Sequence, residues 1–202
     1  VPVPQQLENM PVKEVSKMKT SLLIVLACGA ALGTAIAAEP PAEVLEARGL
    51  VKQFGGGLKG RLVEAMKQGG PVNAIEVCHT DAPAIAQKVS ADSGWEVART
   101  SLKVRNPGNA PDPWELQALE SFEQRKAAGE SLETMEYSET VETDGGKSFR
   151  YMKAIPTAAV CVNCHGAELA PEVAAELDRL YPQDQARGFG VGDIRGAFTL
   201  SK

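Results

Sequence analysis

The sequence predicts an α+β domain in which long N-terminal helices are followed by an antiparallel sheet. Apolar residues recur at three- and four-residue steps between residues 42 and 91, which is the spacing of amphipathic helices. Two later segments, 132–143 and 147–155, have the composition of strands, and the Thr143-Asp144-Gly145-Gly146 sequence between them favours a hairpin turn. Because the helices and the hairpin form separate runs, the pattern favours an α+β domain over a helical bundle.

The composition is that of an ordinary globular protein with an acidic balance. The chain has 202 residues, of which 44% are hydrophobic and 23% are charged, and its formal net charge is −5. This size fits one domain, or at most two small ones. No block of lysine and arginine provides the positive surface that nucleic-acid binding requires, so we expect no nucleic-acid partner.

The N-terminal segment has the layout of an export signal. Met18-Lys19-Thr20 precedes an apolar stretch that runs to Ala38, and Ala35-Ile36-Ala37 fits a small-x-small cleavage pattern. We therefore expect residues 1–38 to comprise an upstream extension and a signal peptide. Residues 39–202 are then one mature domain that is periplasmic or otherwise exported.

Cys28 offers an alternative reading of the same segment. The sequence Val25-Leu26-Ala27-Cys28 is similar to the motif that precedes a lipid-modified cysteine, which would make Cys28 a lipid anchor. Leucine before Ala27 fits that motif poorly, and the apolar stretch continues past Cys28, so plain cleavage is favoured.

The first helix is predicted over residues 42–68. Gly55-Gly56-Gly57 interrupts its pattern, and each helical glycine costs about 1 kcal/mol relative to alanine, so we expect a bend or a close approach by another element there. Gly69-Gly70-Pro71 is predicted to end the helix. Its apolar face consists of Ala47, Val51, Phe54, Leu58, Leu62 and Ala65.

A second helix is predicted over residues 72–91. Cys78 belongs to the apolar stripe of this helix, so its thiol is expected to face inward. The next segment, 95–105, is rich in strand-forming residues, and residues 106–111 are predicted to form a loop.

Local signals mark the later elements. Asp112-Pro113-Trp114-Glu115 has an N-cap residue, a proline at the first helical position and a glutamate at the third, so a helix is predicted from there to about Ala128. A short helix is predicted to begin near Pro171, and a last strand to cover residues 194–200.

The motif that carries chemistry is Cys161-Val162-Asn163-Cys164-His165. This C-x-x-C-H spacing is typical of c-type haem attachment, in which two thiols add to the haem vinyl groups and the adjacent imidazole reaches the iron. The sequence therefore predicts one covalent haem c, held by Cys161 and Cys164, with His165 as the proximal iron ligand.

Other uses of the motif are less favoured. A redox dithiol of the thioredoxin kind needs a βαβ context, which is missing, and a structural disulfide gives no reason for the histidine. Zinc is the stronger alternative, because Cys78 or His79 together with the three motif residues would supply four ligands.

The distal iron ligand must lie upstream of the motif. The chain has two histidines, His79 and His165, and no cysteine, histidine or methionine follows residue 165. Cys78 and His79 are close competitors, since neighbouring helical residues differ by only about 100° around the axis. An imidazole would give a bis-histidine centre, and an anionic thiolate would favour ferric iron. The remaining candidates are Met66, Met135 and Met152.

Several separated motifs resemble a family of exported c-type haem proteins with a PAS-like fold, long catalogued as a domain of unknown function. The resemblance covers nearly all of residues 39–202. It implies an antiparallel sheet with long N-terminal helices, and a haem iron held between His165 and Cys78. His79, beside the expected cysteine, leaves a ligand exchange open. The motifs are 74–78 with 82–86, 99–109, Trp114-Glu115, 161–165, and Tyr181-Pro182 through Gly188 to 192–197.

Two arginines are candidates for the haem propionates. Arg99 and Arg105 belong to the quoted segment 99–109, and a guanidinium can bind a carboxylate through two hydrogen bonds. The alternative for each is an ordinary surface salt bridge.

Three functions compete for such a domain. We expect a redox or diatomic-gas sensor that signals through a partner protein, because Cys78 is a displaceable ligand and the implied fold is common among sensors. A periplasmic electron carrier is the alternative. A haem peroxidase, with His79 as its acid-base group, is less favoured, so we expect no enzyme activity.

Overall fold

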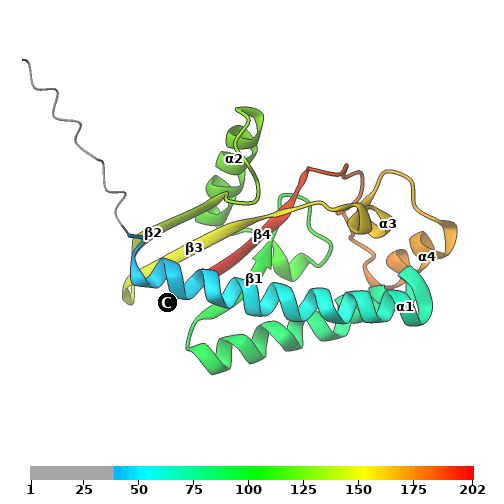
Figure 1. Cartoon of the computed structure of the whole chain (residues 1–202), viewed down its shortest axis with the longest axis horizontal. Helices are drawn as coiled ribbons and strands as arrows, with labels where there is room; N and C mark the ends of the chain where they lie inside the picture. The colour runs from blue at the N-terminus through cyan, green and yellow to red at the C-terminus, as the bar shows by residue number, and fades with distance from the viewer. Residues whose placement is uncertain (1–38) are drawn as a thin grey trace, which may run out of the picture. The chain divides into compact units, whose positions relative to one another are not determined.

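The structure is a computed structural model that describes residues 39–202 (Figure 1). The predicted signal peptide and the alternative anchor at Cys28 lie outside these residues. Among the described helices, none combines the length and the apolar character needed to cross a bilayer. The elements are α1 (Ala42–Ser93), β1 (Glu96–Thr100), a 3-10 turn (Pro107–Asn109), α2 (Pro113–Ala127), β2 (Glu136–Thr143), β3 (Gly146–Pro156), a 3-10 turn (Ala159–Cys161), α3 (Val162–His165), α4 (Pro171–Leu180) and β4 (Ile194–Ser201).

Helix α1 is a helical hairpin with two arms. Its backbone leaves helical geometry at Gly69 and Gly70, and Gly70 has a φ of +69°, which favours glycine. The two predicted helices and the predicted break between them are therefore confirmed. Figure 1 shows the arms running side by side, and an ion pair of 2.9 Å between Arg61 Nε and Asp81 Oδ2 joins them.

The three glycines of the first arm do not bend it. Gly69 and Gly70 are the only residues of α1 with non-helical backbone angles, so the expectation of a bend at Gly55-Gly56-Gly57 is wrong. The other expectation, a close approach, is confirmed at Gly55. A Cβ atom there would lie 2.9 Å from Cζ of Phe198, a residue of β4 that packs directly on the helix backbone.

The four strands form one antiparallel sheet in the order β1-β4-β3-β2. The predicted hairpin is confirmed, because Thr143 pairs with Gly146 across the turn. Strand β2 begins at Glu136 and not at residue 132, since Met135 N donates to Leu132 O and closes a turn. Strand β1 is likewise shorter than predicted and ends at Thr100.

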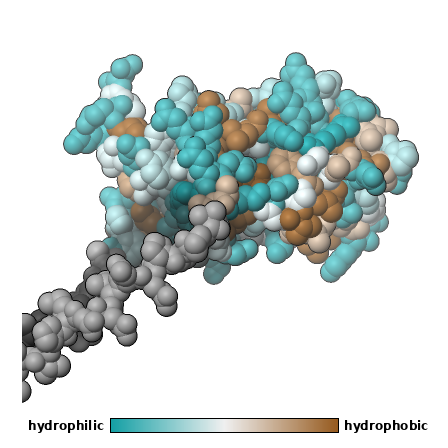
Figure 2. Space-filling view, turned by 90° about the horizontal axis from the view of Figure 1, so that it is seen from above, coloured by the Kyte–Doolittle hydropathy of each residue, from teal (hydrophilic) through white to brown (hydrophobic). Residues whose placement is uncertain are grey.

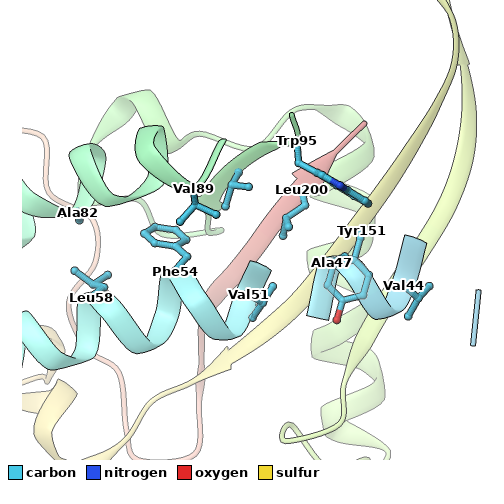
Figure 3. Packing of buried hydrophobic residues seen from close by; sticks show 11 residues of the cluster. Val44, Ala47, Val51, Phe54, Leu58, Ala82, Val89, Trp95, Tyr151 and Leu200 are labelled. Atoms are coloured by element: carbon cyan, nitrogen blue, oxygen red, sulfur yellow. The ribbon is translucent and has the colours of Figure 1, made fainter. Parts of the chain in front are cut away.

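Helices cover both faces of the sheet. The arms of α1 pack on one face, where Phe54 and Val89 meet Trp95, Tyr151 and Leu200 (Figure 3). Helix α2 packs on the other face through Leu119 and Phe122, which contact Met135 and Met152. The predicted fold class, an α+β domain with an antiparallel sheet and long N-terminal helices, is confirmed.

Helix α2 begins where the sequence predicts. The Asp112 side chain accepts a hydrogen bond of 2.8 Å from Glu115 N, and the Glu115 carboxylate accepts one of 3.1 Å from Asp112 N. This reciprocal cap satisfies two backbone donors at the start of the helix.

Figure 2 shows that polar residues cover most of one face of the domain, with separate apolar patches between them.

Candidate haem site

A cavity lies at the end of the sheet that is next to the turn of α1. Its empty volume is about 1020 Å³, which includes the space that is open to solvent. It is lined mainly by apolar side chains of both arms of α1, by the ends of β1, β3 and β4, and by the segment that carries the motif. The lining includes Leu58, Leu62, Met66, Ala74, Ile75, Cys78, Arg99, Arg105, Ile155, Cys161, Cys164, His165, Tyr181, Arg195 and Gly196.

The three motif residues line this cavity together. Cys161 ends the preceding 3-10 turn, and Cys164 and His165 lie on the single helical turn of α3. The helix ends at Gly166, where a Cβ atom would lie 2.6 Å from the carbonyl oxygen of Val162. The two thiols therefore lie about one turn apart, and the imidazole follows them at the cavity wall.

A loop behind the motif, residues 184–190, holds the imidazole of His165. The Nδ1–H group donates to Ala186 O at 2.8 Å, because a carbonyl can only accept. The His165 carbonyl in turn accepts from Phe189 N at 2.9 Å. These bonds leave Nε2 as the nitrogen that could bind a metal.

His165 is a neutral imidazole in this environment. Burial, followed by the charges of Arg195 and Arg105, lowers the pKa of His165 to about 2. A neutral imidazole is the form that binds a metal ion, so no proton has to be displaced from Nε2.

The structure distinguishes between Cys78 and His79, the two competing candidates for the distal iron ligand. Cys78 lines the cavity, whereas His79 is exposed and its ring packs edge-on against Tyr181, with the ring centres 5.2 Å apart. Burial raises the pKa of the Cys78 thiol, and the nearby charges of Arg99, Arg105 and Arg195 oppose that effect. Cys78 is therefore the one of the two whose side chain borders the space beside His165.

The methionines are divided by the fold as well. Met66 lines the cavity, so it keeps its place among the candidates for the distal ligand. Met135 and Met152 are fully buried in the cluster beneath α2, on the other face of the sheet. These two are part of the hydrophobic core.

Arg99 is a half-buried cation whose guanidinium forms no hydrogen bond within the described residues. Within residues 39–202, no hydrogen bond or ion pair engages its guanidinium, which lies 5.6 Å from the centre of the Phe54 ring. Burial lowers the pKa of Arg99, which is the cost of holding an unpaired charge away from water. An orphaned guanidinium at a cavity wall could hold an anionic group such as a carboxylate.

Arg105 has partners already. Its guanidinium binds both carboxylate oxygens of Asp184, at 3.1 and 3.2 Å, and donates to Cys164 O at 2.5 Å and Ala186 O at 3.1 Å. The pair is buried, with side-chain exposures of 10% for Arg105 and 1% for Asp184, so it is no surface salt bridge. Arg105 thus clamps the motif to loop 184–190, and its contact with a propionate stays a prediction.

Arg195 was not singled out from the sequence. Its guanidinium contacts the ring of His165, and Nε lies 3.1 Å from Nδ1 and 3.3 Å from Nε2. The available signal was a charged residue at the start of a short buried strand, inside the quoted segment 192–197.

Gly196 allows β4 to pass close to the end of β1. A Cβ atom at this position would lie 2.3 Å from the carbonyl oxygen of Thr100, a backbone atom that cannot turn aside. We expect Gly196→Ala to lower the free energy of unfolding by about 1–3 kcal/mol, as overpacking does, measured by denaturant titration.

Gly49→Ala is the matched control for this change. Gly49 is exposed in the first arm of α1, and a Cβ there meets nothing within 4 Å. Alanine should stabilise this helical position by up to about 1 kcal/mol. Equal stability of the two variants would contradict the close contact at Gly196.

The described part of the chain contains no set of side chains arranged to bind zinc. No three His, Cys, Asp or Glu side chains there are grouped as a metal ion requires. The four-ligand site that the sequence left open, with Cys78 or His79 added to the motif residues, is therefore not assembled.

Fold and site together define a class of protein: an α+β domain whose sheet ends in a cavity lined by a C-x-x-C-H motif and an upstream cysteine. The chain belongs to the Tll0287-like family, whose model matches residues 6–202. This match confirms the family resemblance found in the sequence, whereas the axial ligands stay a prediction.

One solved structure supports the fold. The crystal structure of the cyanobacterial heme-protein Tll0287 superposes with a TM-score of 0.61 at 24% identity, over 81% of this chain and 96% of that chain. This likeness shows the α+β fold. No curated protein matches the chain.

Proposed function

We propose that residues 39–202 form an exported monohaem c-type domain that acts as a redox or gas sensor. Cys161 and Cys164 attach the haem, and His165 and Cys78 are its axial ligands. The observation that carries the proposal is that Cys78 lines the same cavity as the three motif residues. The name of the similar solved structure, a heme-protein, supports it.

The residues of the cavity fit such a group. The apolar lining suits a porphyrin face, and the unpaired guanidinium of Arg99 suits a propionate. Haem would supply one-electron redox chemistry, with a potential set by its axial ligands. His165 would bind through Nε2, held by the bond from Nδ1–H to Ala186 O.

Cys78 gives the domain a basis for sensing. The Cys78 thiol must lose a proton to bind iron, and burial makes this deprotonation costly. A change in the oxidation state of the iron could therefore release the bond between iron and sulfur. The arm that carries Cys78 packs through Ile75 against Val173 and Leu177 of α4, which gives a path from the ligand to the surface. A signalling or redox protein would receive the output.

Electron transfer is the second candidate function. Val160, next to Cys161, lines the cavity and is 39% exposed, so a haem attached at Cys161 would lie near the surface. The peroxidase hypothesis requires His79 as an acid-base group in the cavity. His79 is exposed, and it is not one of the residues that line the cavity. We therefore propose no enzyme activity.

Optical and EPR spectra of the exported, haem-loaded protein test the ligation. Cys78→Ala should remove the low-spin ferric signal of a thiolate ligand, because within residues 39–202 no other thiol outside the motif lines the cavity. His79→Ala, a change at the neighbouring but exposed residue, should leave that signal intact. The reverse pattern would make His79 the ligand and overturn the proposal.

Carbon monoxide and nitric oxide separate the two functions. For a sensor, these gases should change the spectrum of the ferrous protein, or reduction alone should change the axial ligand. If neither change occurs, the sensor proposal is lost and the electron carrier remains. A rate of electron self-exchange that is too slow for turnover would contradict the electron-carrier function.

A further inference from the structure

The guanidinium of Arg195 contacts the imidazole of His165. Nε of Arg195 is almost equally far from the two ring nitrogens, at 3.1 Å from Nδ1 and 3.3 Å from Nε2. Nδ1 carries the proton that binds Ala186 O, so it cannot accept a hydrogen bond from the arginine. Nε2 is therefore the ring nitrogen that accepts, at 3.3 Å, and the contact sets a cation directly against the imidazole.

Protein groups hold the guanidinium in this position. Nη1 donates to Ser101 Oγ at 3.3 Å and to Lys103 O at 3.4 Å, while Ser101 Oγ donates to Arg195 O at 2.8 Å. The ring of Phe189 lies 5.2 Å from the guanidinium carbon, on the loop behind the motif. Three contacts to the guanidinium, from residues 101–103 and from Phe189, thus hold a flexible side chain.

This cation has no carboxylate partner. In the described part of the chain, no acid forms an ion pair with Arg195, whereas Asp184 is already bound by Arg105 and Arg187. Burial, then the charges of Arg105 and Arg99, lowers the pKa of Arg195 to about 10. A guanidinium keeps its proton in proteins, so the positive charge persists beside His165.

We propose that Arg195 is a positioning residue that sets the reduction potential of the haem by holding a fixed positive charge against its proximal histidine. A nearby cation disfavours the more positive ferric state, and its field is strong where little water screens it. It acts against the thiolate of Cys78, which favours ferric iron. This inference rests on the proposed haem ligation.

Redox titration of the haem-loaded protein tests the inference. We expect Arg195→Met to lower the equilibrium constant of reduction by about tenfold, which corresponds to about 59 mV toward negative potential for one electron. Arg195→Lys keeps a positive charge and should recover a large part of that shift. Recovery by lysine would show that charge matters and not packing alone.

Lys103→Met is the matched control. It also removes one positive charge near Phe189, since Lys103 Nζ lies 5.3 Å from that ring, but this side chain is exposed and does not contact His165. Its shift should be much smaller, because water screens an exposed charge. Equal shifts in Arg195→Met and Lys103→Met would overturn the inference.

A second variant and a second readout complete the test. Should Arg195→Met fail to load haem, Ser101→Ala removes one anchor of Nη1 and should shift the potential in the same direction by less; no shift would overturn the inference. The thiolate low-spin EPR signal should persist in every loaded variant. Its absence from the wild type would refute the proposed ligation, a failure distinct from an unchanged potential.

Discussion

Replacing Cys161 and Cys164 together by alanine is expected to leave no haem on the denatured chain. Both thiols line the cavity and are partly accessible at its wall, and we propose that they form the two thioether bonds. The wild-type protein, matured during export, should keep its haem stain on a denaturing gel. The double variant should lose all of it, because axial ligation alone does not survive denaturation.

Cys78→Ala is the control for this loss. It is the same substitution in the same cavity, but Cys78 lies on α1 and outside the motif, so the stain should remain. A stain that persists in the double variant would show that attachment does not run through the motif. A colourless wild type would remove the cytochrome proposal altogether.

The second large effect is expected at Asp184. Asp184→Asn leaves the buried guanidinium of Arg105 without its anionic partner, and breaking a buried pair in this way costs about 3–5 kcal/mol of unfolding free energy. The loss should also loosen loop 184–190, because Asp184 Oδ1 accepts a hydrogen bond from Ala186 N at 2.9 Å. Denaturant titration of the haem-loaded protein measures the first effect, and the hydrogen exchange of the Phe189 amide reports the second.

Asp178→Asn provides the comparison. Asp178 pairs with Arg187 just as Asp184 does, but its side chain is 70% exposed. Exposed pairs contribute about 0–1 kcal/mol, so this variant should be close to wild type. Similar losses of unfolding free energy in the two variants would mean that the burial of Asp184 does not increase its contribution to stability.

The contribution of Asp184 should depend on pH in a defined direction. Burial by itself raises the pKa of this carboxyl, but hydrogen bonds from Arg105, Arg187 and the Ala186 amide together lower it below its ordinary value of 3.8. A group with a lowered pKa in the folded state contributes fully above its unfolded pKa and loses this contribution as pH falls through the folded one. The difference between wild type and Asp184→Asn should therefore shrink below about pH 4.

The sequence predicted the local elements well, because their signals come from near neighbours in the chain. The cap at Asp112, the turn at Asp144-Gly145 and the break at Gly69-Gly70 each depend on backbone preferences of a few residues. Strand ends were less accurate. Strand β2 starts late because a turn buries Met135 under α2, a contact that depends on a distant helix.

Single glycines show the same difference between local sequence signals and contacts with distant residues. The pattern in the first arm indicated that Gly55-Gly56-Gly57 was unusual, but a bend and a close approach produce the same sequence signal. Only the position of Phe198, more than a hundred residues later in the chain, decided between them. Gly196 carried no distinct signal, although its lack of a side chain lets β4 pass Thr100.

The haem attachment proposed for Cys161, Cys164 and His165 could be inferred from the sequence, since their spacing lies within one helical turn and needs no distant partner to be recognised. Only the tertiary structure decided that Cys78 and not His79 borders the cavity, because the choice depends on how α1 packs against Tyr181 and α4. It also brought Arg195 to His165 across thirty residues of sequence. Contacts between distant segments depend on packing, and no local spacing encodes them.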